Sequence, residues 1–411
     1  MPVDADWERL LSYADRVRKI TYEEGARGVH TESIFPVFNT RSPRDWILPN
    51  LTHLVCKCDT PAGLEHGKIF LNSGLKSLTL KIGHEVSKLS DLFTTNPPIQ
   101  AKLETFSLLS LGKLPEDFLT IMTPQNLLQE VSIIAPGALD AKVGKWVSEL
   151  PELKSLRLDL TGQSVSSVEG FFEEVAPVFG WSTPSSEESR DSGDFSELAL
   201  TEVKKTTAFI GSGTERRGPY PELRQLHLTG QAGNVVTFLN QLAARIHTLE
   251  LQIEDPPEEH DWKDLCAVIC DKFSVSLRSL RILSAPPMGL PRSPGKVHDT
   301  VHRRLLLSHF TPLPTLKKFE IDLPESVVFD NSDIAHLATV CPAVEVLKLC
   351  PQARWPPKLP PPSVTLVRCL SRPVFKRLAN YVCVGGHRST YLRVQAPSYP
   401  RARVGCGGRN R

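Results

Sequence analysis

The stretch PELKSLRLDL at residues 151–160 carries a spacing that recurs along this chain of 411 residues. Its proline is followed two residues later by an apolar residue, Leu153, and then by Leu156 and Leu158. Side chains of an extended strand alternate between its two faces, so Leu156 and Leu158 point to the same side. The stretch therefore predicts a short strand with one apolar face, entered through a turn at Pro151.

The same apolar spacing occurs in eleven copies, which begin at residues 51, 75, 103, 128, 153, 195, 223, 246, 277, 316 and 344. A weaker first copy begins at Val17. Most steps between copies lie near the period of about 20–29 residues that is typical of leucine-rich repeats. One strand cannot bury its own apolar face, whereas stacked parallel strands share a continuous core. We therefore expect an α/β leucine-rich-repeat solenoid of about 11–12 irregular repeats, with a curved parallel sheet and helices on its convex side.

The segments between the copies predict the helical crossovers that parallel strands require. Apolar residues recur at helical spacing in residues 143–150, 168–179, 235–244, 262–273 and 334–340. A proline ends several of these segments, because proline cannot continue a helix and needs no hydrogen-bond donor in the turn that follows. Five prolines stand two residues before a leading apolar residue: Pro49, Pro151, Pro221, Pro314 and Pro342.

Three regions are expected along the chain. Residues 1–45 hold a capping helix at 7–20 and the first strand, and residues 46–350 form the solenoid. Residues 351–411 form a tail that is first proline-rich and then basic, and that we expect to be partly disordered. Polar insertions at 183–194, 211–221 and 284–296 are expected to be loops on one rim of the solenoid.

The net charge of +2 hides an asymmetry between the tail and the rest of the chain. Residues 351–411 contain twelve Lys or Arg and no acidic residue, which leaves 36 basic and 46 acidic side chains elsewhere. Such a tail could bind nucleic acid or an anionic surface. A solvated, partly disordered extension, or a shifted reading frame in the gene model, is the favoured interpretation.

The nine cysteines are expected to be buried, reduced thiols. Cys266 and Cys270 are four residues apart on a predicted helix, but two thiols without further ligands make a poor zinc site. No signal peptide and no apolar stretch near 18 residues is present, so a cytoplasmic or nuclear protein is expected.

No catalytic motif accompanies the repeats. The Gly-rich stretch at 211–218 lacks the phosphate-loop pattern, and neither a nucleophile elbow nor an H-E-x-x-H sequence occurs. His298 and His302 are four residues apart without a fitting carboxylate or thiol, which favours a solvated helix face. We therefore expect no enzyme activity, no catalytic residue, no cofactor and no metal.

The third and fifth positions of each copy point away from the predicted core, onto the concave face of the sheet. Early copies present small hydroxyl side chains there, and later copies present charged and hydrogen-bonding groups, ending with Lys348. Charged groups on such a face select a protein partner, although solubility alone would also explain them. Seven residues are the candidate contacts: Arg157, Gln225, His227, Glu250, Arg281, Lys318 and Glu320.

Several stretches, among them WERLLSYADRVRKI and HLATVCPAVEVLKL, resemble the repeat region of fungal F-box/leucine-rich-repeat proteins over roughly residues 5–370. The repeats depart from the usual pattern, because Asp59, Gly83 and Thr161 stand where an asparagine is usual. The resemblance implies a protein-interaction module, and more finely the substrate-recognition part of an SCF-type ubiquitin-ligase receptor. No F-box motif precedes Trp7, so an adaptor is expected as a partner only if an F-box lies upstream. Binding of nucleic acid or an anionic surface through the basic tail is the less favoured alternative.

Overall fold

The computed structural model describes residues 4–25, 35–38, 42–44, 46–93, 103–175, 219–254, 257–285, 305–323, 331–349, 380–385 and 388–392. The chain forms two compact units. The first contains Met1–Arg157, Ser166–Leu223 and Gln241–Ala244, and the second contains Leu158–Val165, Arg224–Asn240 and Arg245–Arg411.

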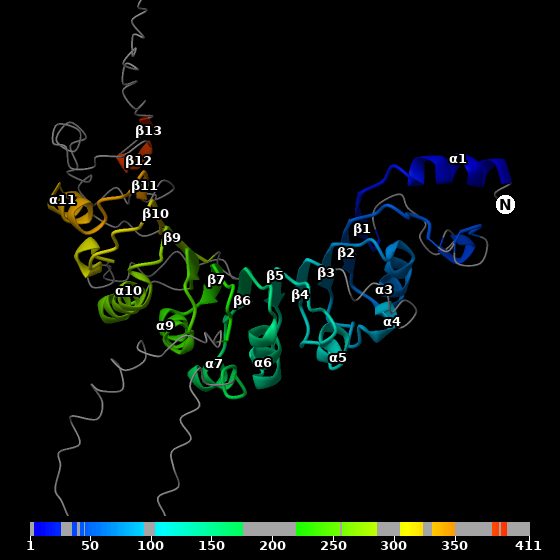
Figure 1. Cartoon of the computed structure of the whole chain (residues 1–411), viewed down its shortest axis with the longest axis horizontal. Helices are drawn as coiled ribbons and strands as arrows, with labels where there is room; N and C mark the ends of the chain where they lie inside the picture. Colours follow the sequence, from blue (N-terminus) through cyan, green and yellow to red (C-terminus); the bar gives the residue numbers. More distant parts are fainter. Residues whose placement is uncertain are drawn as a thin grey trace, which may run out of the picture. The chain divides into compact units, whose positions relative to one another are not determined.

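The first unit alternates strands with short helices (Figure 1). Its strands lie in the order of the sequence, and the pairs from β1 to β5 are parallel. Its elements are α1 (Asp4–Ala14), β1 (Lys19–Glu23), β2 (His53–Cys58), α3 (Pro61–Gly67), η1 (Lys68–Phe70), β3 (Ser77–Ile82), α4 (Ser90–Phe93), β4 (Thr105–Ser110), α5 (Phe118–Met122), β5 (Glu130–Ile134), α6 (Ala141–Glu149), β6 (Ser155–Asp159) and α7 (Val165–Gly170).

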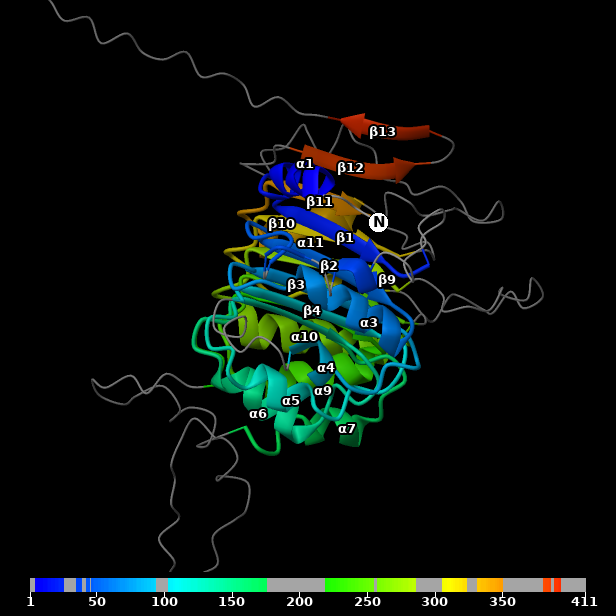
Figure 2. The same cartoon turned by 90° about the vertical axis from the view of Figure 1, so that its right-hand side faces the viewer.

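The second unit repeats this design. Neighbouring strands from β7 to β12 are parallel and follow the sequence order, while β13 runs antiparallel to β12 (Figure 2). Its elements are β7 (Gln225–Gly230), α9 (Ala232–Gln241), β8 (Thr248–Ile253), α10 (Glu259–Phe273), β9 (Ser279–Ser284), η5 (Leu307–His309), β10 (Lys318–Asp322), α11 (Asn331–Val340), β11 (Val346–Leu349), β12 (Asn380–Gly385) and β13 (Arg388–Leu392).

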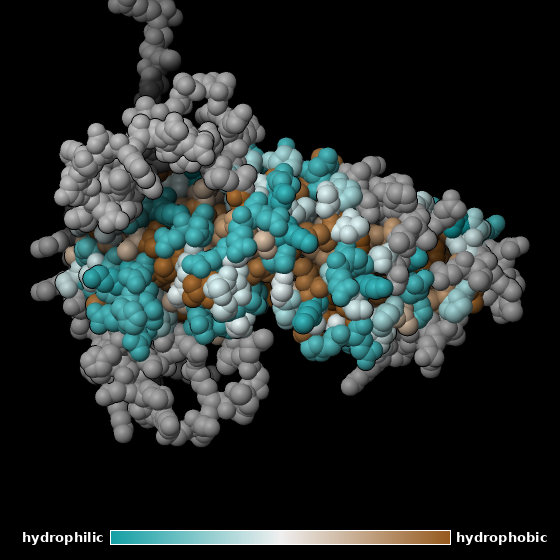
Figure 3. Space-filling model, turned by 90° about the horizontal axis from the view of Figure 1, so that it is seen from below, coloured by the Kyte–Doolittle hydropathy of each residue, from teal (hydrophilic) through white to brown (hydrophobic). Residues whose placement is uncertain are grey.

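The predicted fold class is confirmed, because each described copy of the spacing forms a strand of a parallel sheet. In the register, Ile20 lies beside Leu54, and Leu54 beside Leu78, so equivalent apolar residues stack from strand to strand. The leading apolar residues of these copies, from Leu51 to Val344, are completely buried. Helices cover one face of the strands in each unit, and on that side hydrophilic patches are interspersed with hydrophobic ones (Figure 3).

The predicted proline turns precede the strands. Backbone hydrogen bonds close four of them across Pro49, Pro221, Pro314 and Pro342; in the last, the Val344 N–H donates to the Cys341 carbonyl at 3.2 Å. Proline suits the second position of such a turn because its φ is already near the required value.

The predicted helices at 143–150, 235–244, 262–273 and 334–340 correspond to α6, α9, α10 and α11. Of the segment 168–179, α7 covers the beginning, and residues 176–179 lie outside the described part of the chain. The expected N-terminal helix is shorter than residues 7–20, because α1 ends at Ala14 and β1 begins at Lys19.

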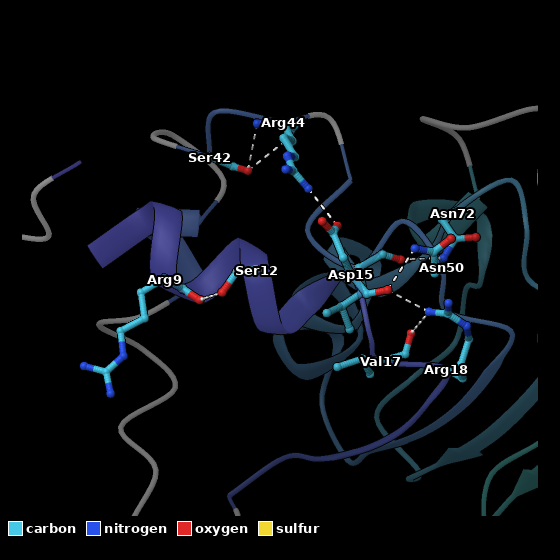
Figure 4. Close-up of polar contacts among 10 residues, drawn as sticks. Arg9, Ser12, Asp15, Val17, Arg18, Ser42, Arg44, Asn50 and Asn72 are labelled. Carbon is cyan, nitrogen blue, oxygen red and sulfur yellow. Dashed lines mark hydrogen bonds and ion pairs between the residues drawn. The ribbon is translucent and has the colours of Figure 1, made fainter. Parts of the chain in front are cut away.

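The end of α1 is held by polar contacts with the segments that follow it (Figure 4). The Asp15 carbonyl accepts hydrogen bonds from Asn50 Nδ2 at 2.9 Å and from Arg18 Nη1 at 2.8 Å, and the Asp15 carboxylate pairs with Arg44 at 2.8 Å. On the apolar side of α1, the Trp7 ring lies 5.8 Å from that of Phe38. These contacts position α1 beside the first repeat.

The copy at residues 195–200, the insertion at 183–194 and the histidines at 298 and 302 lie outside the described residues. Just after β6, the Leu160 N–H donates to the Thr229 carbonyl of β7 at 2.7 Å, and both of these residues belong to the second unit. The strands β12 and β13 were not predicted. The apolar spacing does recur at Leu378, Tyr381 and Cys383, and this copy, which accompanies β12, was missed.

Candidate functional site

The candidate site is the face of the sheet opposite the helices in the second unit, which we call the open face. Along β7 to β11, buried residues alternate with partly exposed ones, so every second side chain points to this face. His227, Glu250, Arg281, Glu320 and Lys348 occupy the fifth position of successive copies. Each is the direct register partner of the next.

These five residues form a continuous row in which carboxylates alternate with nitrogen-bearing side chains, and we call it the charge ladder. His227 Nδ1 lies 3.7 Å from Glu250 Oε2, and Arg281 Nη1 lies 3.2 Å from the same oxygen. Arg281 Nε lies 3.4 Å from Glu320 Oε1, and Lys348 Nζ lies 3.2 Å from Glu320 Oε2. Each carboxylate is thus shared between two nitrogen-bearing side chains on neighbouring strands.

The two carboxylates are the most buried members of the charge ladder. The Glu250 and Glu320 side chains are 20% and 19% exposed, whereas Arg281 and Lys348 are 43% and 40% exposed. Burial lowers the pKa of Arg281, but the adjacent Glu320 and Glu250 outweigh this effect and raise the pKa above its ordinary value. The guanidinium therefore remains charged between its two partners.

The contacts of Arg281 differ in quality. Its Nη1 group donates a hydrogen bond to Glu250 Oε2 at 3.2 Å. Its buried Nε is close enough to Glu320 for an ion pair but makes no hydrogen bond of acceptable geometry. Arg281 therefore makes a directed hydrogen bond with Glu250 and an ion pair with Glu320, and the charge of Glu320 is the largest single influence that raises its pKa.

The structure brings four of the seven predicted contact residues into the charge ladder: His227, Glu250, Arg281 and Glu320. Gln225 and Lys318 lie two residues earlier on β7 and β10, both exposed on the same open face. Arg157 lies exposed on β6 and belongs to the first unit. Lys348 was not among the seven, although its fifth position in the last copy placed it in register with Glu320.

The open face of the first unit has a different character. Its central rows carry hydroxyl side chains, such as Ser77, Thr79 and Ser107. The described ion pair on these strands joins Lys57 to Glu23 at 2.7 Å, on β2 and β1. The chemically distinctive open face is therefore that of the second unit.

Five of the cysteines are buried thiols, as predicted. Cys56, Cys58, Cys266, Cys270 and Cys341 are all free and buried. Desolvation raises the pKa of Cys341 to about 12. Desolvation, and to a smaller extent the neighbouring Cys270, raises the pKa of Cys266.

Among the described residues, no group of three or more His, Cys, Asp or Glu side chains could hold a metal ion. Within that same part of the chain, no helix has the length and apolar character needed to cross a bilayer.

Comparison with known proteins leaves the chain unassigned to a family. No protein-family model matches it. No curated protein matches it either. Among solved structures, a chain in the crystal structure of the Rad7 and Elc1 complex of yeast is similar over 76% of this chain and 74% of that chain, at 15% identity and a TM-score of 0.33. A likeness at that TM-score carries no argument about function.

Proposed function

We propose that this protein is a non-enzymatic protein-interaction module whose binding surface is the open face of the second unit. The observation that supports this proposal is the charge ladder, in which side chains from five consecutive strands hold one another in place. Side chains that are already ordered lose less entropy when a partner binds. Fixed charges of alternating sign also select a partner with the complementary pattern.

The charge ladder retains capacity for further hydrogen bonds. Glu250 directs the same oxygen, Oε2, toward both His227 and Arg281. A carboxylate has about four acceptor sites and a guanidinium five donors, so neither Glu250 nor Arg281 is saturated by these contacts. A partner can therefore add a basic group at Glu250 and an acidic group at Arg281 without breaking the ladder.

The described thiols support a role without catalysis. A cysteine nucleophile acts as a thiolate and needs a lowered pKa. Burial instead raises the pKa of Cys266 and Cys341, and it places them in the core. These cysteines are better suited to packing than to covalent chemistry.

The proposal is tested by affinity capture from the protein's own cells, followed by binding of the purified partner. Arg281→Glu should weaken that binding by at least about tenfold, because it reverses the central charge of the ladder. The matched control is Lys263→Glu, since Lys263 is exposed on α10 of the same unit but on the helix-covered side. Equal loss in both variants, or recovery of no protein partner, contradicts the proposal.

The finer proposal is that the partner is a substrate delivered to an SCF-type ubiquitin ligase. Its support is the resemblance of the repeats to those of F-box/leucine-rich-repeat proteins. If it is correct, ligase subunits are recovered with the natural full-length protein, and Arg281→Glu stabilises the captured partner in cells. If Arg281→Glu changes neither the ubiquitylation nor the lifetime of the captured partner, the ubiquitin-ligase role is contradicted and only the binding role is left.

A further inference from the structure

A second charged row borders the open face of the second unit, and its composition is unlike that of the charge ladder. It occupies the second position of successive copies, one residue before each strand begins: Arg224, His247, Arg278 and Lys317. Lys318 stands beside it at the start of β10. We call these five residues the basic edge.

Backbone hydrogen bonds hold the basic edge in one line. The N–H groups of His247, Arg278 and Lys317 each donate to the carbonyl of the residue before them in the row, all at 2.8 Å. Neighbouring strands lie about 4.8 Å apart, so the line extends over roughly 14 Å. It stops at β11, where the same position is Glu345, which pairs with Lys317 at 3.4 Å.

The first unit provides an internal comparison at the same repeat position. There, Lys76 pairs with Glu104 at 2.7 Å, and Lys154 donates to the side chain of Gln129 at 2.9 Å. Like charges on directly adjacent strands are destabilising, whereas opposite charges are favourable. At this repeat position, the first unit places a basic side chain beside an acidic or amide side chain. The second unit places basic side chains beside one another.

The electrostatic consequence is visible at His247. Desolvation by burial, and then the nearby Arg278 and Arg224, lower the pKa of this imidazole. Both arginines therefore lie close enough to His247 for their charges to act on it. Arg278 and Lys318 are exposed, and within the described residues neither has an ion-pair partner.

We propose that the basic edge binds an acidic segment of the protein partner, a short run of Asp or Glu side chains in extended conformation. The line of about 14 Å matches four to five residues of an extended peptide at roughly 3.3 Å each. A nucleic acid has a negative phosphate at every nucleotide. Its backbone would extend past the basic edge and be repelled by Glu345 and by the carboxylates of the charge ladder. This inference rests on the proposed function, because it names the chemistry of the partner that occupies the adjoining open face.

The experiment uses the full-length protein and fluorescein-labelled hexaglutamate, with binding followed by fluorescence anisotropy at low salt. The double variant Arg278→Glu/Lys318→Glu should bind about tenfold more weakly than the wild type, since each exposed pair contributes up to about 1 kcal/mol. The difference should disappear at about 1 M salt, where the Debye length is near 3 Å. Both residues are exposed, so a thermal melt should show unchanged folding.

The matched control is Lys142→Glu/Lys154→Glu, which changes the net charge equally but on exposed positions of the first unit. Both double variants keep the basic tail, so any general attraction of hexaglutamate to the tail is the same in each. The control should change the affinity for hexaglutamate by less than about twofold. Equal loss in both double variants, or no loss in either, overturns the inference. Tighter binding of an oligothymidylate of equal charge, lost with the same substitutions at Arg278 and Lys318, replaces it with nucleic-acid binding.

The same variants separate this inference from the proposed function. A captured partner that loses binding with Arg281→Glu but not with Arg278→Glu/Lys318→Glu supports the open face and overturns the basic edge. Weaker partner binding in both variants supports the open face and the basic edge together.

Discussion

At the scale of single residues, Arg281 connects the two halves of the charge ladder. It lies between Glu250 and Glu320, whose side chains are only about one-fifth exposed. A partly buried carboxylate depends on its cation, because it has lost part of its hydration. The stability of this region therefore depends on Arg281 more than on an arginine without such partners.

Replacing Arg281 by glutamine should lower the free energy of unfolding by about 1 kcal/mol, since two partly exposed pairs are lost. Urea denaturation at low salt measures this change, and the loss should shrink at about 1 M salt. Arg157→Gln is the control, because Arg157 has the same repeat position on β6 and is exposed. An equal loss for Arg157→Gln would show that the charge ladder adds nothing to stability.

The lowered pKa of His247 predicts a loss of stability in acid. Below the ordinary histidine pKa of 6.5, the unfolded chain takes up the proton more readily than the folded chain, so stability falls as the pH decreases toward the folded-state pKa. His247→Gln should match the wild type above about pH 7.5 and lose less stability near pH 5. Urea midpoints across this range provide the measurement; parallel profiles would contradict the prediction. In an NMR titration, Arg278→Gln should raise the pKa of His247.

At the scale of elements, helix packing sets local requirements that helix propensity does not show. Gly144 lies buried in α6, and a methyl group there would come within 1.7 Å of the Phe171 carbonyl oxygen, just after α7. Glycine is thus required at this position by the close approach of the two segments. At Gly233, near the start of α9, such a methyl group has no atom within 4 Å apart from its chain neighbours and the backbone of its own helix.

Two identical substitutions should therefore have opposite effects. Gly144→Ala should destabilise the protein by more than about 2 kcal/mol, because backbone must move to relieve the clash. Gly233→Ala should stabilise it by about 0.5 kcal/mol, because alanine restricts the unfolded chain and favours the helix. Thermal unfolding of both variants tests the pair. A neutral Gly144→Ala would mean that α6 and the segment after α7 separate without cost.

At the scale of the whole molecule, the parallel array continues into the region expected to be a tail. β11 pairs with β12 in parallel, and β12 pairs with β13 in antiparallel fashion. A further copy of the apolar spacing, at Leu378, Tyr381 and Cys383, accompanies β12, and Tyr381 and Cys383 are the register partners of Leu347 and Leu349. No such copy accompanies β13. The pairing protects the edge of β11, which otherwise presents unpaired N–H and C=O groups.

Removal of residues 351–411 should therefore raise the hydrogen-exchange rates of amides in β11 by about tenfold or more. Each repeat contacts mainly its neighbours, so the amides of β8 should exchange as in the full chain. Hydrogen exchange measured in parallel on the full-length protein and on the truncated protein tests this expectation. Unchanged exchange in β11 would show that β12 does not pair with it in solution.

The fold was largely predictable because its signal is local and repeated. A spacing such as that of Leu223, Leu226 and Leu228 sets which side chains of a strand share a face, and many copies force the strands to stack. For the same reason, His227, Glu250, Arg281 and Glu320 could be placed on one face from the sequence. Their pairing could not, since it depends on contacts between residues 23 to 39 positions apart in the chain.

The sequence alone determined the strands, their buried faces and the candidate surface, because alternation and helical spacing are properties of neighbouring residues. Only the tertiary structure decided that Arg281 bridges the carboxylates of Glu250 and Glu320. It also decided that basic residues converge on one edge of the second unit, and that β13 pairs antiparallel with β12. The physical reason is register: hydrogen bonds between strands align side chains that are distant in sequence, and charge interactions depend on that alignment.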